Sequence, residues 1–115
     1  MRDAQYPIEG RAGARTGQRV LVLGGPLDMA GVPDFLRAVR EETAPVVILD
    51  FLKVTYIDSS GVGALIQLLT GFQKAKRKLV LANVGERVVA VLDLTRVKGL
   101  FMVFASVSEA ESGLS

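Results

Sequence analysis

The sequence predicts an α/β domain built on a mixed, mostly parallel β-sheet of about five strands with about four helices. Two short apolar runs, VVIL at 46–49 and LVLA at 79–82, have the length and composition of strands covered on both faces, as in the interior of a parallel sheet. Apolar residues at helical spacing follow each run. Strands that alternate with helices imply parallel strands joined by right-handed crossovers.

The N-terminal part of the chain predicts two strands. A short strand is expected near Gln5 to Glu9, followed by a turn. The second strand is RVLVLG at 19–24, which is β-branched and apolar and ends in the glycine and proline turn residues of GGPLD. The first strand is additional to the alternating series, so it can run antiparallel to its neighbour.

Three internal helices follow from the spacing of apolar residues. The first begins near Gly31, has Pro33 suited to its first turn and ends near 42–44, before Pro45. The second runs from residue 60, and the third covers 86–94. Their apolar faces are, in order, Val32, Phe35, Leu36 and Val39; Val62, Leu65, Ile66, Leu69 and Phe72; and Val88, Val91 and Leu92.

The C-terminal part predicts a last strand at Phe101 to Phe104 and a short terminal helix. Ser106 and Glu109 have the capping-box spacing that marks the start of such a helix. The chain has 115 residues, which is about the size of one hydrophobic core. We therefore expect a single domain over 1–115, with its core in about 19–112.

The composition favours a binding protein over an enzyme. The chain has no cysteine, which excludes disulfides, zinc-thiolate sites and thiol catalysis. It has no histidine either, so it lacks the side chain most often used for acid-base catalysis near neutral pH and for metal binding. We therefore expect no catalytic residue, cofactor or resident metal.

The charge pattern gives little support for nucleic-acid binding. The net charge is +2, and the basic residues are scattered except for Lys74, Lys76, Arg77 and Lys78, which we interpret as the end of the second helix. Two tyrosines and five phenylalanines are too few to interleave with a basic stripe, so no direct contact with nucleic acid is expected. No apolar run approaches the ~20 residues of a membrane span and the N-terminus lacks a secretion signal, so we expect a cytoplasmic protein.

The stretch YIDSSGVG at 56–63 stands where a predicted strand is followed by a helix. Asp58, Ser59 and Ser60 are all types that cap a helix N-terminus, and capping is the commoner use of such residues. Gly61 and Gly63 do not fit capping alone, because a glycine inside a helix costs ~1 kcal/mol relative to alanine. They indicate that a phosphate or the backbone of a protein partner approaches this turn closely.

Three enzyme-like interpretations of this stretch are weaker. The glycines form only a fragment of a dinucleotide-binding GxGxxG motif, because Ile66 stands at the third glycine. A metal site from Asp50 and Asp58 lacks a third ligand. A serine nucleophile would need a base, and the spacing nominates none.

Four segments of the chain match a known family. They are LGGPLD at 23–28, VVILDFLKVTYIDSSGVGAL at 46–65, LVLANV at 79–84 and VLDLTRVKGLF at 91–101. These segments resemble the STAS domain, most closely that of stand-alone bacterial anti-sigma factor antagonists. The resemblance covers about residues 19–112, and its most specific part is the apolar strand, the Asp-Ser-Ser-Gly turn and the helix that follows.

The resemblance implies a phosphorylation switch. In this family the serine directly after the aspartate is phosphorylated by a partner anti-sigma factor that is itself a serine kinase, and a 2C-type phosphatase reverses the modification. The matching residue is Ser59. The unmodified antagonist binds the anti-sigma factor and frees the sigma factor. Asp28 matches an acid near the same surface, although a role in the turn or cap of the next helix is equally open.

The helical pattern taken alone gives a different serine. Counted back from the exposed positions Gly63, Gln67, Thr70 and Lys74, the residue on the same face is Ser60, while Ser59 is expected off that face. Ser60 is therefore the second choice for phosphorylation. The predicted partner-binding residues are Asp28, Asp58, Ser60, Gly61, Gly63, Ala64, Gln67 and Leu68.

Two points stay open at this stage. Leu68 is placed on the outer flank of the helix because it lies off the main apolar stripe, but a core position is the alternative. The same fold also serves as a scaffold subunit of stress-signalling assemblies and as an accessory subunit of lipid transporters. From a different class, a small nucleotide-binding enzyme is the remaining alternative, since a fold does not fix a function.

Overall fold

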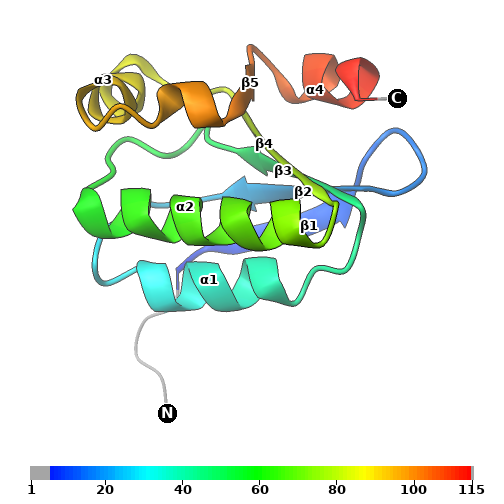
Figure 1. The fold of residues 1–115 in the computed structure, drawn as a ribbon, viewed down its shortest axis with the longest axis horizontal. Coiled ribbons are helices and arrows are strands. Elements are labelled where there is room, and N and C mark those ends of the chain that lie inside the picture. The colour runs from blue at the N-terminus through cyan, green and yellow to red at the C-terminus, as the bar shows by residue number, and fades with distance from the viewer. Residues whose placement is uncertain (1–5, 115) are drawn as a thin grey trace.

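The computed structural model describes residues 6–114. They form a five-stranded sheet in the order β1-β2-β3-β4-β5, in which β1 is antiparallel to β2 and the other neighbours are parallel (Figure 1). The predicted fold class is confirmed. The elements are β1 (Ile8–Ala12), β2 (Gln18–Leu23), α1 (Val32–Arg40), β3 (Val46–Asp50), α2 (Ser59–Lys74), β4 (Lys78–Ala82), α3 (Glu86–Leu94), the 3₁₀ helix η1 (Lys98–Leu100), β5 (Met102–Phe104) and α4 (Val107–Gly113).

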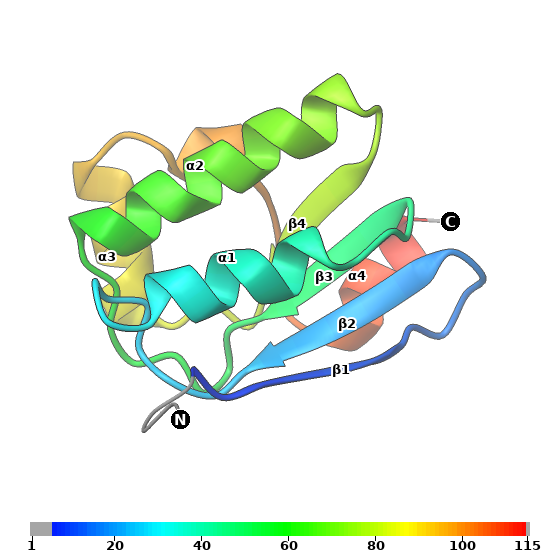
Figure 2. The ribbon, with the colours of Figure 1, turned by 90° about the horizontal axis from the view of Figure 1, so that it is seen from below.

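The sheet separates two apolar cores, each lined by alternate residues of the central strands. α1, α2 and α3 contribute to the larger core, and α4 covers the smaller one on the opposite face (Figures 1 and 2). Burial on both faces explains why β3 and β4 are continuous apolar runs in the sequence. The rows in register across β2, β3 and β4 are Leu21, Leu49 and Leu81 toward the larger core and Val20, Ile48 and Val80 toward the smaller one.

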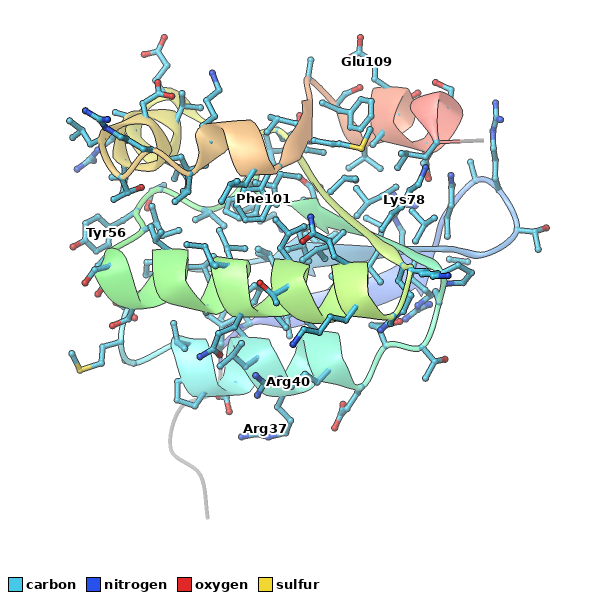
Figure 3. The ribbon with its side chains drawn as sticks, viewed as in Figure 1. Arg37, Arg40, Tyr56, Lys78, Phe101 and Glu109 are labelled. Atoms are coloured by element: carbon cyan, nitrogen blue, oxygen red, sulfur yellow. The ribbon has the colours of Figure 1, made fainter. Side chains whose placement is uncertain are left out.

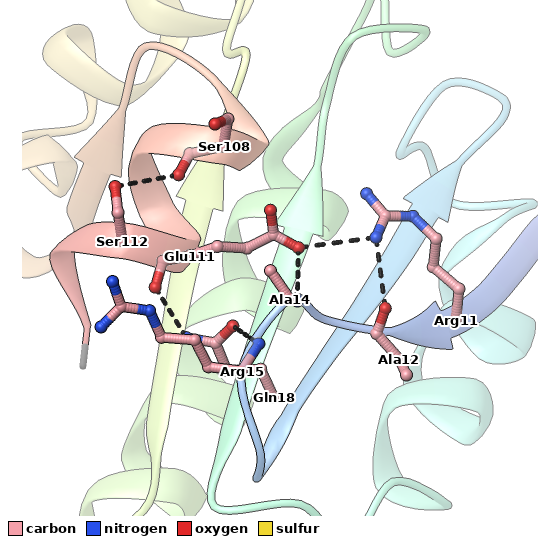
Figure 4. A network of polar contacts seen from close by, with 8 residues as sticks. All are labelled: Arg11, Ala12, Ala14, Arg15, Gln18, Ser108, Glu111 and Ser112. Atoms are coloured by element: carbon pink, nitrogen blue, oxygen red, sulfur yellow. Dashed lines mark hydrogen bonds and ion pairs between the residues drawn. The ribbon is translucent and has the colours of Figure 1, made fainter.

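A polar network fastens α4 to the turn between β1 and β2. Glu111 of α4 accepts a hydrogen bond from the Ala14 N–H at 2.8 Å and lies 3.5 Å from the Arg11 guanidinium (Figure 4). The buried Gln18 side chain donates to the Glu111 carbonyl at 2.9 Å. The Ser106 hydroxyl accepts from the Glu109 N–H at 3.0 Å, so the predicted cap of this helix is confirmed.

The first strand lies later in the sequence than predicted. It spans Ile8–Ala12, so the prediction of a strand near Gln5 to Glu9 is right only at its end, and Gln5 lies outside the described residues. β1 is an edge strand that is mostly exposed, so it carries no alternating apolar pattern that could locate it. Its register is set by pairing with β2 across a turn that the Gly13 N–H closes on the Gln18 carbonyl at 2.8 Å.

Other element boundaries differ from the predictions by a few residues. α1 ends at Arg40, before the predicted 42–44, and its last turn closes when the Glu41 N–H donates to the Arg37 carbonyl. Phe101 does not belong to β5; it follows η1, which the sequence did not predict, and its ring is buried in the larger core. β2, β3 and β4 are parallel, so the segments that follow them emerge at one edge of the sheet.

Candidate partner-binding site

The site is built on the N-terminal turn of α2. Asp58 is the N-cap residue, and its Oδ1 accepts a hydrogen bond from the Gly61 N–H at 3.1 Å. A carboxylate at this position satisfies an amide of the first turn and faces the positive end of the helix dipole. The capping interpretation is confirmed for Asp58, and Ser59 and Ser60 are the first residues of the helix itself.

Asp58 also joins this turn to the loop that follows β2. Its Oδ2 accepts from the Met29 N–H at 3.2 Å, and its own N–H donates to the Leu27 carbonyl at 3.1 Å. The Leu27 N–H in turn donates to the Tyr56 carbonyl at 3.0 Å. Two loops far apart in the sequence are thus held edge to edge beside Ser59, and residues 27–29 become part of the same surface.

Asp28 lies in this joined loop but has a turn-forming contact of its own. Its Oδ1 accepts a hydrogen bond from the Gly31 N–H at 3.0 Å, just before α1 begins. The proposed role of Asp28 in the turn before this helix is therefore present in the structure. The side chain is half-buried, and its neighbour Met29 is exposed.

The two serines differ in accessibility. Ser59 is exposed, whereas Ser60 is half-buried. The expectation that Ser59 falls off the exposed face of α2 is wrong, because Ser59 precedes the exposed Gly63 by four residues and so lies on the same side of the helix. Within residues 6–114, the Ser59 hydroxyl makes no hydrogen bond. It is an accessible hydroxyl with no structural task.

The two glycines have different reasons for being glycine. A Cβ atom on Gly61 would overlap the Leu27 carbonyl oxygen and approach Ile57 Cγ1 to 2.7 Å, so the close backbone approach at Gly61 comes from the chain's own loop. Gly61 is buried and offers no side-chain surface to a partner. Gly63 is exposed, and outside its own helical turn no atom of residues 6–114 lies within 4 Å of the position its Cβ would occupy. Of the two, only Gly63 has no intramolecular explanation.

Two predicted binding residues are in the core. Leu68 is 4% exposed and Ala64 is 3% exposed, and both pack in the larger core under α2. The prediction that Leu68 lies on the outer flank of the helix is wrong, and the core position that the sequence left open is the observed one. Gln67, the residue before Leu68, is exposed as predicted and accepts a hydrogen bond from Arg40 of α1 at 3.4 Å.

Three exposed apolar residues in the loops that follow β2 and β3 did not emerge from the sequence. Met29 is 75% exposed, Leu52 is 69% exposed and Tyr56 is 48% exposed. Met29 and Tyr56 come from the two joined loops, and Figure 3 shows Tyr56 beside the first turn of α2. Large apolar side chains in loops belong to no helical or strand period, and only Tyr56 stands close enough to the DSSG turn in the sequence to have drawn attention there.

Tyr6 holds the other side of the loop that carries Asp28. Its hydroxyl donates to the Gly25 carbonyl at 2.7 Å, and its ring packs edge-on against Phe35 with centroids 6.1 Å apart. The Tyr6 N–H donates to Asp34 Oδ2 at 2.9 Å. Burial raises the pKa of Tyr6 to about 12, and the negative charge of Asp28 acts in the same direction. The loop is therefore clamped between Tyr6 and the first turn of α2.

The acidic residue at the end of β3 is used within the chain. Asp50 is 9% exposed, and its Oδ1 accepts from the Leu52 N–H and the Asn83 side chain, both at 3.0 Å. Both carboxylate oxygens of Asp58 also accept hydrogen bonds from the backbone, as described above. Over residues 6–114, no three acidic side chains gather in a group that could hold a metal ion.

No helix within the described part of the chain is both long enough and apolar enough to span a membrane.

The chain matches known proteins over most of its length. Residues 8–110 match the family model of the STAS domain. The anti-sigma-B factor antagonist of Staphylococcus epidermidis is 31% identical over 84 residues, which cover 70% of this chain and 78% of the relative.

Two solved structures share the fold. The phosphorylated form of SpoIIAA, a Bacillus cell fate determinant, has a TM-score of 0.70 at 20% identity. The alignment covers 95% of this chain and 100% of that one. A sulfate transporter family protein from Wolinella succinogenes has a TM-score of 0.76 at 27% identity, with 86% of this chain and 85% of that one covered. With its family model matched from β1 into α4, this chain belongs to the STAS domain family, among the anti-sigma factor antagonists.

Proposed function

We propose that this chain binds a serine-kinase anti-sigma factor when Ser59 is unmodified, and that phosphorylation of Ser59 by that partner switches the binding off. A 2C-type phosphatase would restore the binding form. The chain acts in this scheme as a binding protein and not as an enzyme. Ser60 is the second choice for the modified residue.

The observation that carries the proposal is that Asp58 and Ser59 have different roles in the turn. Asp58 caps α2 and joins the two loops, whereas the neighbouring hydroxyl is exposed and makes no hydrogen bond to residues 6–114. A kinase can therefore reach the Ser59 hydroxyl without unfolding the turn. The added charge would sit at the positive end of the helix dipole, where it stabilises the turn by about 0.3 to 2 kcal/mol.

The proposed docking surface is revised from the sequence prediction. On α2 it consists of Ser59, Ser60, Gly63 and Gln67, which are exposed or half-buried. The two joined loops add Asp28, Met29 and Tyr56. Gly61 and Ala64 lie beneath this surface, and Asp58 shapes it through its hydrogen bonds.

A phosphate would weaken binding because a partner seated on this surface would have to desolvate it. Phosphorylation adds about −1.5 to −2 charge, and a buried charge without its counterpart costs about 2 to 5 kcal/mol. At about 1.4 kcal/mol per decade, this is roughly thirtyfold to a few thousandfold in affinity. SpoIIAA, which shares the fold, is known in a phosphorylated form, and this supports the proposed mode of control.

The test uses the anti-sigma factor kinase that co-purifies with the chain from its native cell. Incubation with ATP should place one phosphate on Ser59, read by mass spectrometry of the peptide that contains it. Ser59→Asp should weaken binding by at least about thirtyfold, while its circular dichroism spectrum stays native. Ser59→Ala should bind like the unmodified protein and resist inactivation by ATP.

Ser60→Ala is the matched control for the neighbouring hydroxyl. If this variant resists phosphorylation while Ser59→Ala still accepts it, the second choice is correct. If Ser59→Asp binds with unchanged affinity, the switch proposal is wrong.

A second candidate function follows from the likeness to the sulfate transporter family protein, which at 27% identity is covered over 85% of its chain. In that case the chain would act as a domain or subunit of a transporter, one form of the alternative role that the fold allows. Co-purification from detergent-solubilised membranes would distinguish the two, because a transporter partner would be recovered there in place of a kinase.

A further inference from the structure

α1 and α2 lie side by side (Figure 2), and an open groove of about 450 Å³ is lined by residues of both helices. Ile66 is half-buried in it, and the other lining residues are exposed. The groove continues the exposed side of α2 beyond Gln67, away from Ser59. Its lining residues are Arg40, Ile66, Gln67, Thr70, Gly71 and Lys74.

The groove has one sign of charge. Among residues 6–114, Arg40 and Lys74 are its two ionisable lining residues, and no carboxylate of this part of the chain lines it. Arg40 Nη2 donates to Gln67 Oε1 at 3.4 Å, so the guanidinium of α1 reaches the exposed side of α2. A guanidinium has five N–H donors in a fixed fork that matches a carboxylate. The neighbouring Arg37 differs, because it pairs with Asp34 at 3.0 Å.

A partner seated at Ser59 is expected to extend toward this groove. Specific protein interfaces bury about 800 Å² on each side, which is more than one helical turn and two loop tips provide. Along α2, Gly63 and Gln67 follow Ser59 at intervals of four residues and are exposed. They connect the serine to the groove without an intervening charged residue.

We propose that the groove between α1 and α2 binds an acidic segment, rich in Asp or Glu, of the anti-sigma factor that docks at Ser59. This inference depends on the proposed function. Gln67 follows Ser59 by eight residues, about 12 Å along a helix, which exceeds the Debye length of about 8 Å at physiological salt. The groove and the phosphate should therefore contribute independently to affinity.

The first experiment measures the affinity of the co-purified anti-sigma factor for the double variant Arg40→Gln/Lys74→Gln. Loss of two exposed charge pairs should weaken binding by about two- to thirtyfold, more strongly at low salt, and should flatten the salt dependence. In combination with Ser59→Asp, the two fold-changes should multiply. Arg15→Gln/Lys98→Gln removes two exposed cations outside the groove and is the matched control, expected to bind within about twofold of wild type.

The second experiment is independent of the anti-sigma factor. Titration of ¹⁵N-labelled protein with an octaglutamate peptide should shift the amide signals of Gln67, Thr70 and Gly71. Octaglutamine should not shift them, and the groove variant should lose the response. Vesicles containing phosphatidylglycerol form a third arm, which tests an anionic membrane as the ligand.

The possible outcomes test the groove and the Ser59 switch separately. Unchanged affinity of the groove variant, with Ser59→Asp still defective, would overturn the groove and leave the Ser59 switch intact. Binding of the vesicles in place of octaglutamate would also overturn it. If no anti-sigma factor binds wild type but octaglutamate maps to the groove, the proposed function fails and the preference for an acidic segment stands.

Discussion

The two ends of α2 are both tied to segments that flank α1, but in opposite ways. At the N-terminal end, Asp58 is bonded to backbone groups of the loop before α1, and Ser59 and Met29 are left exposed. At the C-terminal end, the Arg77 guanidinium stacks over the Phe72 ring at 4.0 Å. It also donates to the carbonyls of Ala44 and Glu42, at 2.9 and 2.8 Å, in the segment after α1.

The N-terminal end of α2 therefore presents an exposed surface, whereas the contacts of Arg77 form an internal attachment, the C-terminal clasp. At the C-terminal end, the Arg77 guanidinium is satisfied by the chain itself. At the N-terminal end, Asp58 anchors the backbone, and the Ser59 hydroxyl and the apolar side chains of Met29 and Tyr56 are exposed. The prediction that the basic cluster of residues 74–78 marks the end of the helix is right for Lys74, which lies in the last turn. Arg77 has a different role, because it joins α2 to the segment between α1 and β3.

The largest expected effect comes from forcing apart the N-terminal end. Gly61→Ala places a Cβ against the Leu27 carbonyl oxygen, and neither backbone can move without breaking the hydrogen bonds between the two loops. We expect the free energy of unfolding to fall by about 3 kcal/mol, measured by urea denaturation.

Gly63→Ala is the control for the same substitution two residues later. Open space surrounds that position, so alanine should raise the free energy of unfolding by up to about 1 kcal/mol through helix propensity. If the two variants were equally destabilised, the crowding at Gly61 would not be the cause. If Gly63→Ala is stable but binds the anti-sigma factor less well, the partner approaches this face closely.

Arg77→Ala should come next, because it opens the C-terminal clasp. It removes the stacking on Phe72 and two hydrogen bonds from a charged donor, so we expect a loss of about 2 kcal/mol in the free energy of unfolding. Arg77→Lys keeps the charge but not the fork of donors, and should recover less than half of that loss. Affinity for the anti-sigma factor should stay unchanged in both, and reduced affinity would show that the two ends are not separate.

Asp58→Ala should have a smaller effect on stability and a larger one on binding. Loss of the cap costs about 1 to 1.5 kcal/mol, and the loop that carries Asp28 and Met29 loses one of its attachments. Asp58→Asn retains an acceptor oxygen and should recover most of the stability. If the alanine variant binds the anti-sigma factor with native affinity, the joined loops are not part of the interface.

The fold could be predicted from the sequence because its central strands are buried on both faces and its helices are buried along one side. β3, β4 and α3 lie where the apolar patterns predict, since packing in the core requires those patterns. β1 and η1 are different. Their exposed residues carry no periodic signal, and their positions depend on pairing with β2 and on the path of the chain around Phe101, which is tertiary information.

The site was predictable to the level of its motif and less so to the level of its surface. The DSSG turn was located correctly at the start of α2, and Asp58 caps it. The helical count failed for Leu68, because a helix lying against both a sheet and a second helix buries more than one narrow stripe. The contribution of Met29 arises from contacts between loops distant in sequence, which no local pattern reports.

The smallest expected effect at neutral pH concerns Tyr6, which supports the N-terminal end of α2 from behind the loop. Tyr6→Phe removes the hydrogen bond to the Gly25 carbonyl, and we expect a loss of about 1 kcal/mol at pH 7.

The pH dependence sharpens this prediction. Burial raises the pKa of Tyr6 from 10.0 to about 12, so between these values the unfolded chain loses a proton that the folded chain retains. Stability that depends on Tyr6 is fully present below pH 10 and falls as the pH rises toward 12. The difference in urea midpoint between wild type and Tyr6→Phe should therefore shrink over this range. Tyr56→Phe retains Tyr6 and should follow wild type throughout; a constant difference for Tyr6→Phe would mean that the ring is not held as tightly as its contacts indicate.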